Sequence, residues 1–474
     1  MSRHLGTISA IALCLAAPQF AGATTYTRDE AVKIALEKSS AVKTAEEDLV
    51  SANSQVDAGY GNALPSIDLS ATVTRIFGLD DVEKSTKISD AAAGMAQSND
   101  ENGHPNANAF DTQVIGPALD GFTNQMMKQA YRWQSTVGIT ATQILYAQGK
   151  VGTGIEIAKT YKHIKEVNLD NAKASVRYDV NNAFDQLIYL DSALAVLNES
   201  KNMLQENVNF VEQGLKSGVI TELDLIRVQL SMDQVNSKIN TLEKSRILAR
   251  NALLNTMGLE WETDVQFQGE LRDPTQGYSY PDTSMSNVKK RRKELMMLEA
   301  TEEMLSKNVS IEQGGYKPTV VLVGGLKYSN NQNEFYKWDA PDWDENINKY
   351  VALNLTMNLF NGMKTKEAVV QAKSNLRSTQ IQKETAERGF RVQIESCANT
   401  LEDANAQIEI AKRQIDLAQK NYDLTNDAYK LGRETQLNLL TAENTLRTAK
   451  LDYLQAVVDW NKAYNALLQA TGEY

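Results

Sequence analysis

The sequence has few of the residues on which metal sites and disulfide frameworks depend. It holds two cysteines and three histidines among 474 residues, and the cysteines lie far apart, as do the histidines. Zinc sites and disulfide-stabilised folds need such residues in sets, so neither is expected. There is no paired base and nucleophile, and the scattered Asp and Glu fit solvated helix faces. We therefore single out no catalytic, cofactor-binding or metal-binding residue, and we expect no enzyme and no cofactor.

Proline and aromatic residues are also scarce. The chain has 8 prolines, none of them between Pro117 and Pro274 or after Pro341, and aromatic residues make up 7% of it. Because proline breaks helices, long proline-free stretches of a polar chain favour long helices with narrow apolar stripes. The formal net charge of -11 argues against a protein that binds nucleic acid by neutralising phosphates.

Long apolar runs are missing too, because no segment of the expected mature chain approaches the ~20 consecutive apolar residues of a membrane-spanning helix. Residues 1–23 are expected to be a secretory signal peptide, with a basic start, an apolar stretch over residues 8–17 and the small-residue cleavage site Ala21-Gly22-Ala23. Its removal leaves Cys397 as the remaining cysteine, so no internal disulfide is expected. If the mature protein enters a membrane, it must do so as β-strands.

The strongest feature that is present is an internal duplication. Residues 137–258 and 351–472 align without a gap at a constant offset of 214. Asn251-Ala252-Leu253-Leu254, for example, returns as Asn465-Ala466-Leu467-Leu468. Each half is therefore expected to run helix, strand, loop, strand, long helix, tight turn, helix. The expected division is a first repeat over 24–258, an equatorial connector over 259–283 and a second repeat over 284–474.

Two strands are predicted in each half from a period of two. Val351, Leu353 and Leu355, for example, alternate with Asn354 and Thr356. The predicted strands lie at about residues 66–77, 136–146, 318–329 and 350–361. Each is about ten residues long, which is the length that a tilted membrane strand needs.

After the second strand of each half, apolar residues recur at spacings of three and four, as in a coiled coil. In the first copy this seam consists of Ala183, Leu187, Leu190, Leu194, Leu197, Lys201, Leu204, Val208, Val211 and Leu215. The long helices are predicted at about 150–216 and 364–430, and the returning helices at about 221–257 and 435–470. Since the returning helices are about half as long, we expect shorter helices at 28–59 and 286–313 to stack on them.

Four strands cannot close a barrel, and open sheet edges in lipid would leave backbone groups unpaired. If the strands cross a membrane, the chain must therefore oligomerise. Two copies would give eight strands around a filled interior, whereas three copies would give twelve strands around an open lumen. Polar residues that alternate with the apolar ones, such as Thr140 and Asn354, suit a water-filled interior.

The turns between the long and the returning helices, predicted at about 216–223 and 430–437, carry the most specific local pattern. The first reads Gly218-Val219-Ile220-Thr221-Glu222-Leu223-Asp224-Leu225, and the second reads Gly432-Arg433-Glu434-Thr435-Gln436-Leu437-Asn438-Leu439. Glycine can end a helix in the left-handed conformation, and threonine can cap the helix that follows.

With these tips, its duplicated halves and its paired strands, the chain resembles the TolC family of outer-membrane efflux proteins, and the resemblance covers essentially all of the expected mature sequence. It implies a mainly α fold with β, in which long coiled-coil helices form an α-barrel. It also implies a homotrimer, whose four transmembrane strands per protomer complete a 12-stranded β-barrel in the cell outer membrane. The helical barrel would project into the periplasm.

The function that the resemblance implies is a passive exit duct of a tripartite efflux or type I secretion system. The implied partners are a periplasmic adaptor (membrane fusion protein), an inner-membrane transporter of the RND, ABC or MFS type, and outer-membrane lipid. The adaptor would bind the tips at Gly218, Thr221, Leu223, Asp224, Leu225, Gly432, Thr435, Leu437, Asn438 and Leu439. The closed aperture would be lined by Asp224, Tyr429, Asn438 and Thr441, although acids often occupy the last two positions in the family.

The alternative is a soluble periplasmic coiled-coil scaffold or adaptor protein, which would be released by osmotic shock and would not conduct ions. An enzyme ranks third. Gly149-Lys150-Val151-Gly152-Thr153-Gly154 superficially resembles a phosphate-binding loop but lacks the required spacing of glycine, lysine and hydroxyl residue. These glycines are expected to ease the bend between strand and helix.

Overall fold

The computed structural model describes residues 24–77, 93–98, 110–120, 132–261, 265–274, 277–332 and 347–474. The predicted signal peptide lies outside these ranges. The chain divides into two compact units. We call residues 55–158 and 307–373 the strand unit, and residues 1–54, 159–306 and 374–474 the helical unit.

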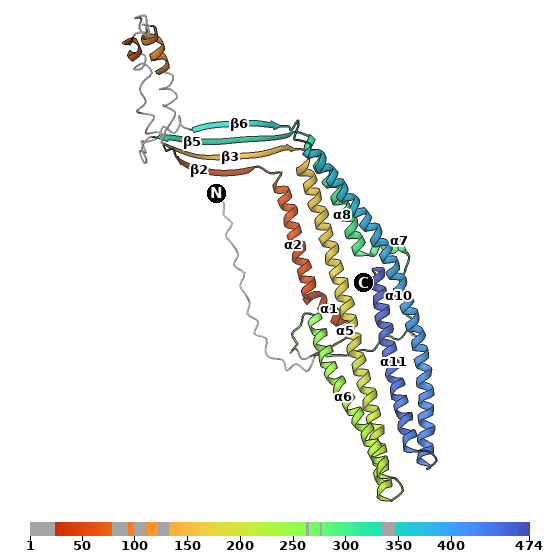
Figure 1. Cartoon of the computed structure of the whole chain (residues 1–474). Coiled ribbons are helices and arrows are strands. Elements are labelled where there is room, and N and C mark those ends of the chain that lie inside the picture. Colours follow the sequence, from red (N-terminus) through yellow and green to blue (C-terminus); the bar gives the residue numbers. More distant parts are fainter. Residues whose placement is uncertain are drawn as a thin grey trace, which may run out of the picture. The chain divides into compact units, whose positions relative to one another are not determined.

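The strand unit contains a four-stranded antiparallel sheet in the order β2-β3-β5-β6 (Figure 1). Its strands are β2 (Ser66–Arg75), β3 (Trp133–Ala147), β5 (Thr319–Gln332) and β6 (Ile347–Thr356). The last strand stops before the predicted residue 361, since Thr356 pairs with Thr319, which directly follows Pro318. Proline has no N–H group to continue the ladder. Strands β2 and β6 form the two edges of the sheet.

The two faces of the sheet differ in polarity. Residues paired across an antiparallel sheet point to the same side, so the register assigns the paired residues to faces. One face is mainly apolar and carries Ile67, Leu69, Ala71, Val73, Val137, Ile139, Ala141, Leu322, Gly324, Leu326, Val351, Leu353 and Leu355, together with the polar residues Arg75, Ser135, Gln143, Asn330 and Lys349. The other is mainly polar and carries Asp68, Ser70, Thr72, Thr136, Thr140, Thr142, Lys327, Asn348, Asn354 and Thr356, together with Ile144, Val321, Val323, Tyr350 and Ala352. We call these the apolar face and the polar face.

Helices of 7 to 67 residues make up most of the rest of the described chain. They are α1 (Arg28–Lys38), α2 (Ser40–Gly61), α5 (Lys150–Lys216), α6 (Glu222–Thr256), α7 (Met285–Arg291), α8 (Lys293–Gln313), α10 (Lys364–Lys430) and α11 (Gln436–Thr471). Helices α5 and α10 have 67 residues each. In the connector, β4 (Val265–Phe267) pairs in parallel with β1 (Thr24–Tyr26). Among the described residues, no helix has the length and hydropathy that crossing a membrane would require.

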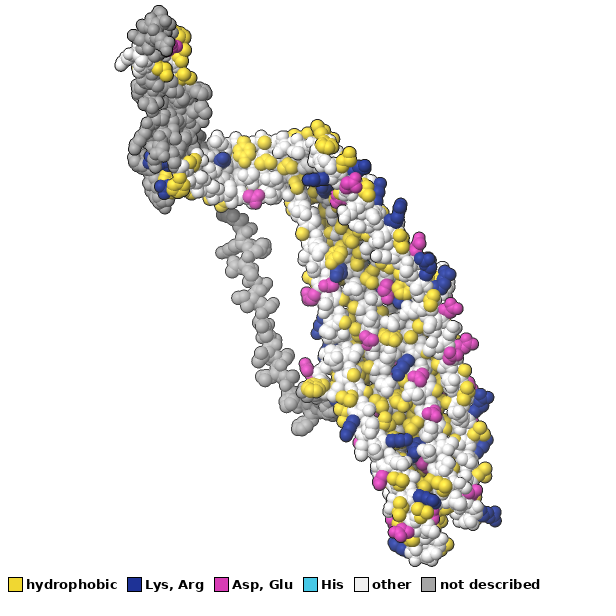
Figure 2. Space-filling model, in the orientation of Figure 1, with side chains coloured by type: hydrophobic (Ala, Val, Ile, Leu, Met, Phe, Trp, Pro, Cys, Tyr) yellow, Lys and Arg dark blue, Asp and Glu magenta, His cyan; other side chains and the backbone are white. Residues whose placement is uncertain are grey.

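The core of the helical unit follows the predicted coiled-coil seam. Leu187, Leu197, Leu204 and Val211 are at most 2% exposed, and Lys201, the predicted polar interruption, is exposed. The coiled-coil prediction is therefore confirmed for α5. Figure 2 shows charged side chains spread over the surface of the helices, while the visible surface of the four-stranded sheet carries few of them.

The single helices predicted at 28–59 and 286–313 are wrong, because each is broken in two, at Ser39 and at Arg292. Each break lies against the glycine that follows a returning helix. A Cβ atom at Gly258 would lie 2.4 Å from the carbonyl oxygen of Lys38, and one at Gly472 would lie 2.9 Å from the backbone of Arg291. At these two points the two segments of backbone approach so closely that only glycine fits.

Candidate functional site: the paired helical turns

Both turns of the helical unit end their long helix in the same way. Gly218 and Gly432 take left-handed conformations, with φ of 73° and 70°. The next N–H group in each turn donates to the carbonyl oxygen five residues earlier, at 2.9 Å in the first turn and 2.8 Å in the second. This hydrogen bond satisfies a carbonyl group that the ended helix would leave unpaired. The sequence repeat is therefore a repeat of backbone geometry.

The helices that follow both turns are capped by the predicted threonines. The Thr221 hydroxyl accepts the N–H of Asp224, and the Thr435 hydroxyl accepts the N–H of Asn438, each at 3.3 Å. The turns differ in where they hold negative charge. Thr221 donates to the Asp224 carboxylate at 2.7 Å, whereas the Asn438 amide donates to the Glu434 carboxylate at 2.6 Å. The second turn therefore has its acidic residue at Glu434, four residues before Asn438, and Asn438 stands where the first turn has Asp224.

The predicted tip leucines fall into two groups. Leu223 and Leu437 occupy equivalent positions of the repeat and are 55% and 54% exposed. Leu439 is 4% exposed, and Leu225 is half-buried against a core cluster that includes Val228. Of these four predicted binding residues, Leu223 and Leu437 are the ones whose side chains a partner could reach directly.

The predicted aperture residues are only partly brought together. The Tyr429 ring meets the Phe210 ring edge-on, with centroids 5.6 Å apart. Burial raises the pKa of Tyr429, and the negative charge of Asp224 adds to this effect, so the first turn and α10 influence each other. Asn438 and Thr441 are exposed on α11. Among the described residues, no group of three or more His, Cys, Asp or Glu side chains could hold a metal ion.

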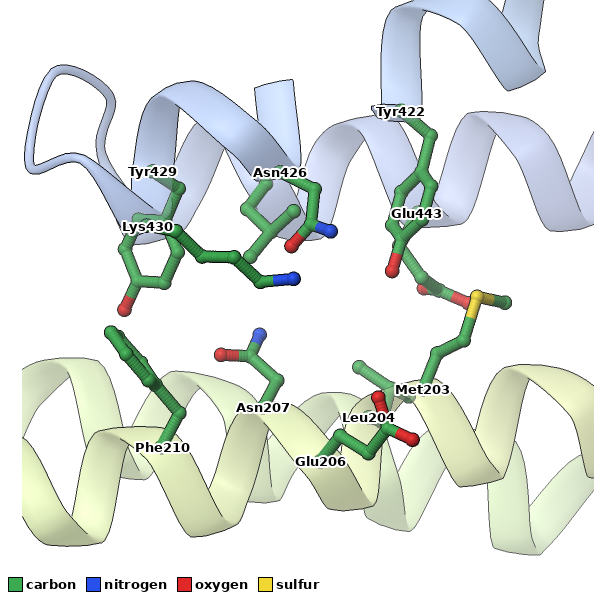
Figure 3. A pocket seen from close by; sticks show the side chains of 11 residues that line it. Met203, Leu204, Glu206, Asn207, Phe210, Tyr422, Asn426, Tyr429, Lys430 and Glu443 are labelled. Atoms are coloured by element: carbon green, nitrogen blue, oxygen red, sulfur yellow. The ribbon is translucent and has the colours of Figure 1, made fainter. Parts of the chain in front are cut away.

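The two helical hairpins are α5 with α6 and α10 with α11. A cavity of about 180 Å³ lies between them, and Tyr429 is one of the residues that line it. Figure 3 shows α5 on one side and α10 with α11 on the other, with the Lys430 side chain extending between Asn207 and Asn426. The walls consist of Met203, Leu204, Glu206, Asn207, Phe210, Tyr422, Asn426, Tyr429, Lys430, Leu439 and Glu443. The hairpins are therefore incompletely packed against each other at this level.

A buried polar cluster that the sequence reasoning missed joins the hairpins beside the cavity. The Ser200 hydroxyl of α5 donates to the Glu443 carboxylate of α11, which is 3% exposed. Arg447 lies 3.4 Å from the same carboxylate and donates to Ser200 at 3.3 Å. The signal in the sequence was a Glu and an Arg four residues apart on α11, where two charged side chains can share one helix face.

We expect the stability of the hairpin pair to fall as pH rises. Burial raises the pKa of Glu443 above its ordinary 4.5, despite the opposing effects of Ser200 and Arg447. The unfolded chain therefore loses this proton first, and folding is progressively opposed from pH 4.5 upward until the folded carboxyl has also ionised. Thermal unfolding should show that Glu443→Gln removes this part of the pH dependence. Glu402→Gln, on an exposed position of α10, is the control, and parallel curves for Glu443→Gln and the wild type would contradict the expectation.

Comparison with known proteins gives consistent matches. A family model described as Outer membrane efflux protein matches residues 31–259 and 285–473. The Outer membrane efflux protein BepC of Brucella suis biovar 1 (strain 1330) is 22% identical over 345 residues, covering 72% of this chain and 73% of that protein.

Solved structures match the fold at low sequence identity. The outer membrane protein VceC of Vibrio cholerae is 14% identical with a TM-score of 0.69, and the match covers 94% of this chain and 96% of that one. The MtrE outer membrane channel of Neisseria gonorrhoeae, in its open state, is 17% identical with a TM-score of 0.72, covering 94% and 88%. The Campylobacter jejuni CmeC outer membrane channel is 14% identical with a TM-score of 0.73, covering 94% and 85%.

Proposed function

Because this chain belongs to the outer membrane efflux protein family, we propose that it forms a homotrimeric, passive exit duct. The duct is the outer-membrane channel of a tripartite efflux or type I secretion system. A periplasmic adaptor opens it at the paired helical turns, and an inner-membrane transporter of the RND, ABC or MFS type supplies the energy. The chain itself is a channel component and not an enzyme.

The observation that carries the proposal is the two-faced sheet with two open edges. Among the residues that the structure describes, strands β2 and β6 each have a neighbouring strand on one side only. In lipid, every unpaired backbone group would cost several kcal/mol, so an isolated sheet is not stable there. Pairing β6 of one protomer with β2 of the next satisfies both edges, and three protomers close a ring of twelve strands. The polar face then lines the lumen and the apolar face contacts lipid.

The exposure of the apolar face also argues against the soluble scaffold. Val351 is 80% exposed, Leu353 64% and Leu355 65% on an edge strand of the sheet. Soluble proteins rarely leave such a contiguous apolar surface in water. A bilayer accounts for this surface, whereas a periplasmic scaffold would have to cover it with another protein.

The paired turns support adaptor docking. Leu223 and Leu437 are exposed at equivalent positions, so one protomer presents the same apolar contact twice. A trimer would present six such contacts in a ring, each beside a capped helix start. An adaptor with repeated apolar contacts of its own would engage this ring. The cavity between α5 and α10 would ease separation of the two hairpins, because the hairpins are incompletely packed there.

Cell fractionation and planar bilayers test the proposal. We expect the mature protein to stay with outer-membrane vesicles after osmotic shock and to produce ion conductance in a planar lipid bilayer. Release into the periplasmic fraction, together with silence in the bilayer, would favour the soluble scaffold instead.

A further inference from the structure

Two buried polar atoms in the wall of the cavity between the hairpins have no hydrogen-bond partner among the described residues. They are the amide oxygen of Asn207 on α5 and the hydroxyl oxygen of Tyr429 on α10. Figure 3 shows the Asn207 amide and the Tyr429 hydroxyl pointing into the space beside the Phe210 ring. A buried polar atom without a partner is unfavourable, so the cavity offers one unused hydrogen-bonding position on each hairpin.

Aromatic and aliphatic side chains supply a large part of the same wall. The Phe210 and Tyr429 rings meet there with centroids 5.6 Å apart, and Met203, Leu204 and Leu439 also line the cavity. The cavity volume of about 180 Å³ exceeds that of an engineered apolar cavity of about 150 Å³ that binds benzene in another protein. The space is therefore large enough for one six-membered aromatic ring.

The charged side chains at the cavity balance one another. The wall includes two acids, Glu206 and Glu443, and one lysine, Lys430. Arg447 lies 3.4 Å from the Glu443 carboxylate and supplies the second positive charge. Because the two signs are present in equal number, no net charge attracts an anion or a cation, and the cavity favours a neutral molecule.

We propose that the cavity binds a neutral, single-ring phenol. A phenol hydroxyl donates one hydrogen bond and accepts another, so it can donate to the Asn207 amide oxygen and accept from the Tyr429 hydroxyl. The ring then lies against Phe210 and the aliphatic part of the wall. Water would supply the same hydrogen bonds but would leave this apolar surface hydrated, which is unfavourable. The site goes beyond the proposed function, and binding does not depend on that function.

An occupant contacts both hairpins, because Asn207 belongs to α5 and Tyr429 to α10. A ligand that binds the packed arrangement more tightly than the separated one shifts the equilibrium toward the packed arrangement. In the proposed duct, a bound phenol would therefore oppose separation of the hairpins and favour the closed tip.

The test is hydrogen–deuterium exchange of the purified mature protein, resolved by peptide, with phenol, anisole and toluene as probes. Anisole keeps the acceptor oxygen and loses the donor, whereas toluene has the shape of phenol and lacks both. We expect phenol to slow exchange in the segments of α5 and α10 that line the cavity. Anisole should need a concentration about fivefold higher for the same protection, the effect of one lost hydrogen bond, and toluene a still higher one.

Two variants remove the two hydrogen-bonding atoms separately. Tyr429→Phe keeps the ring and loses the hydroxyl, so it should weaken phenol binding about fivefold and leave toluene binding unchanged. Asn207→Leu should remove the advantage of phenol over anisole. The matched control is Tyr422→Phe, because Tyr422 lies at the other end of the cavity in Figure 3 and its hydroxyl is not one of the two unpaired atoms. Exchange without a probe shows that each variant keeps its fold, and Tyr429→Phe decides the matter if Asn207→Leu does not.

Equal protection by phenol and toluene would overturn the choice of a phenol, as would equal weakening by Tyr429→Phe and Tyr422→Phe. If none of the three probes protects the cavity segments, the cavity holds water only and the site is overturned. Protection spread evenly over all helices would also overturn it, because it would show unspecific binding. Each of these results leaves the proposed duct intact, since fractionation and bilayer conductance test the duct separately.

Discussion

Leu223→Asp or Leu437→Asp is expected to abolish export while the trimer still assembles. Both side chains are more than half exposed, so the substitutions leave the core unchanged and should alter the free energy of unfolding by less than about 0.5 kcal/mol. In the proposed complex with an adaptor, however, each leucine is buried. A carboxylate there would lose the apolar contact and be desolvated without a partner, which costs about 2–4 kcal/mol per contact and recurs in each protomer.

The measurement is sensitivity of cells to an exported toxic compound, together with the oligomeric state of the purified protein. Leu223→Met and Leu437→Met keep an apolar side chain and should retain export. Leu439→Asp is a contrasting variant, because that leucine is 4% exposed and its replacement should lower stability as well as export. Normal export by both aspartate variants would remove the turns from the docking surface.

The second large effect is expected where the sheet meets lipid. Val351→Arg puts a guanidinium on the apolar face near the middle of β6, which costs about 2–4 kcal/mol at the centre of a bilayer. We expect the amount of assembled protein in the outer membrane to fall several-fold. Ala352→Arg is the matched control, since the neighbouring residue points to the polar face and its arginine would lie in a water-filled lumen.

Quantitative immunoblots of outer-membrane fractions distinguish these variants. Ala352→Arg should assemble at nearly the wild-type level and should change only the single-channel conductance of the pore. Equal assembly of both arginine variants would mean that the two faces of the sheet meet the same environment. That result would contradict the assignment of lipid and lumen to the two faces.

The helices and strands could be predicted from the sequence where a short hydrophobic period is repeated over many residues. The 67-residue helices and the strands appear near their predicted positions because their periods of three to four and of two persist over many residues. The offset of 214 also indicated that Thr221 and Thr435 would play the same role, and both cap a helix. The regular polar and apolar alternation of β6 made its two faces readable in advance.

Features that depend on contacts between distant segments could not be read in this way. The break at Ser39 lies against Gly258, which comes more than two hundred residues later in the chain. The burial of Leu439, in contrast to Leu437, depends on which side of α11 faces α5. The bond from Ser200 to Glu443 joins residues 243 positions apart, so the spacing of Glu443 and Arg447 on α11 could not by itself indicate the partner on α5.

The central claim is that neighbouring protomers satisfy each other's sheet edges, and cysteine cross-linking between β2 and β6 tests it most directly. In a Cys397→Ser background, a cysteine at Asn354 is combined with single cysteines along residues 66–75. Within one chain β3 and β5 separate these strands by roughly 14 Å, too far for a disulfide that needs Cα atoms within about 7 Å. We predict disulfide-linked dimers and trimers on denaturing gels for those positions of β2 that face the same side as Asn354. Monomers at every position of β2 would contradict the account.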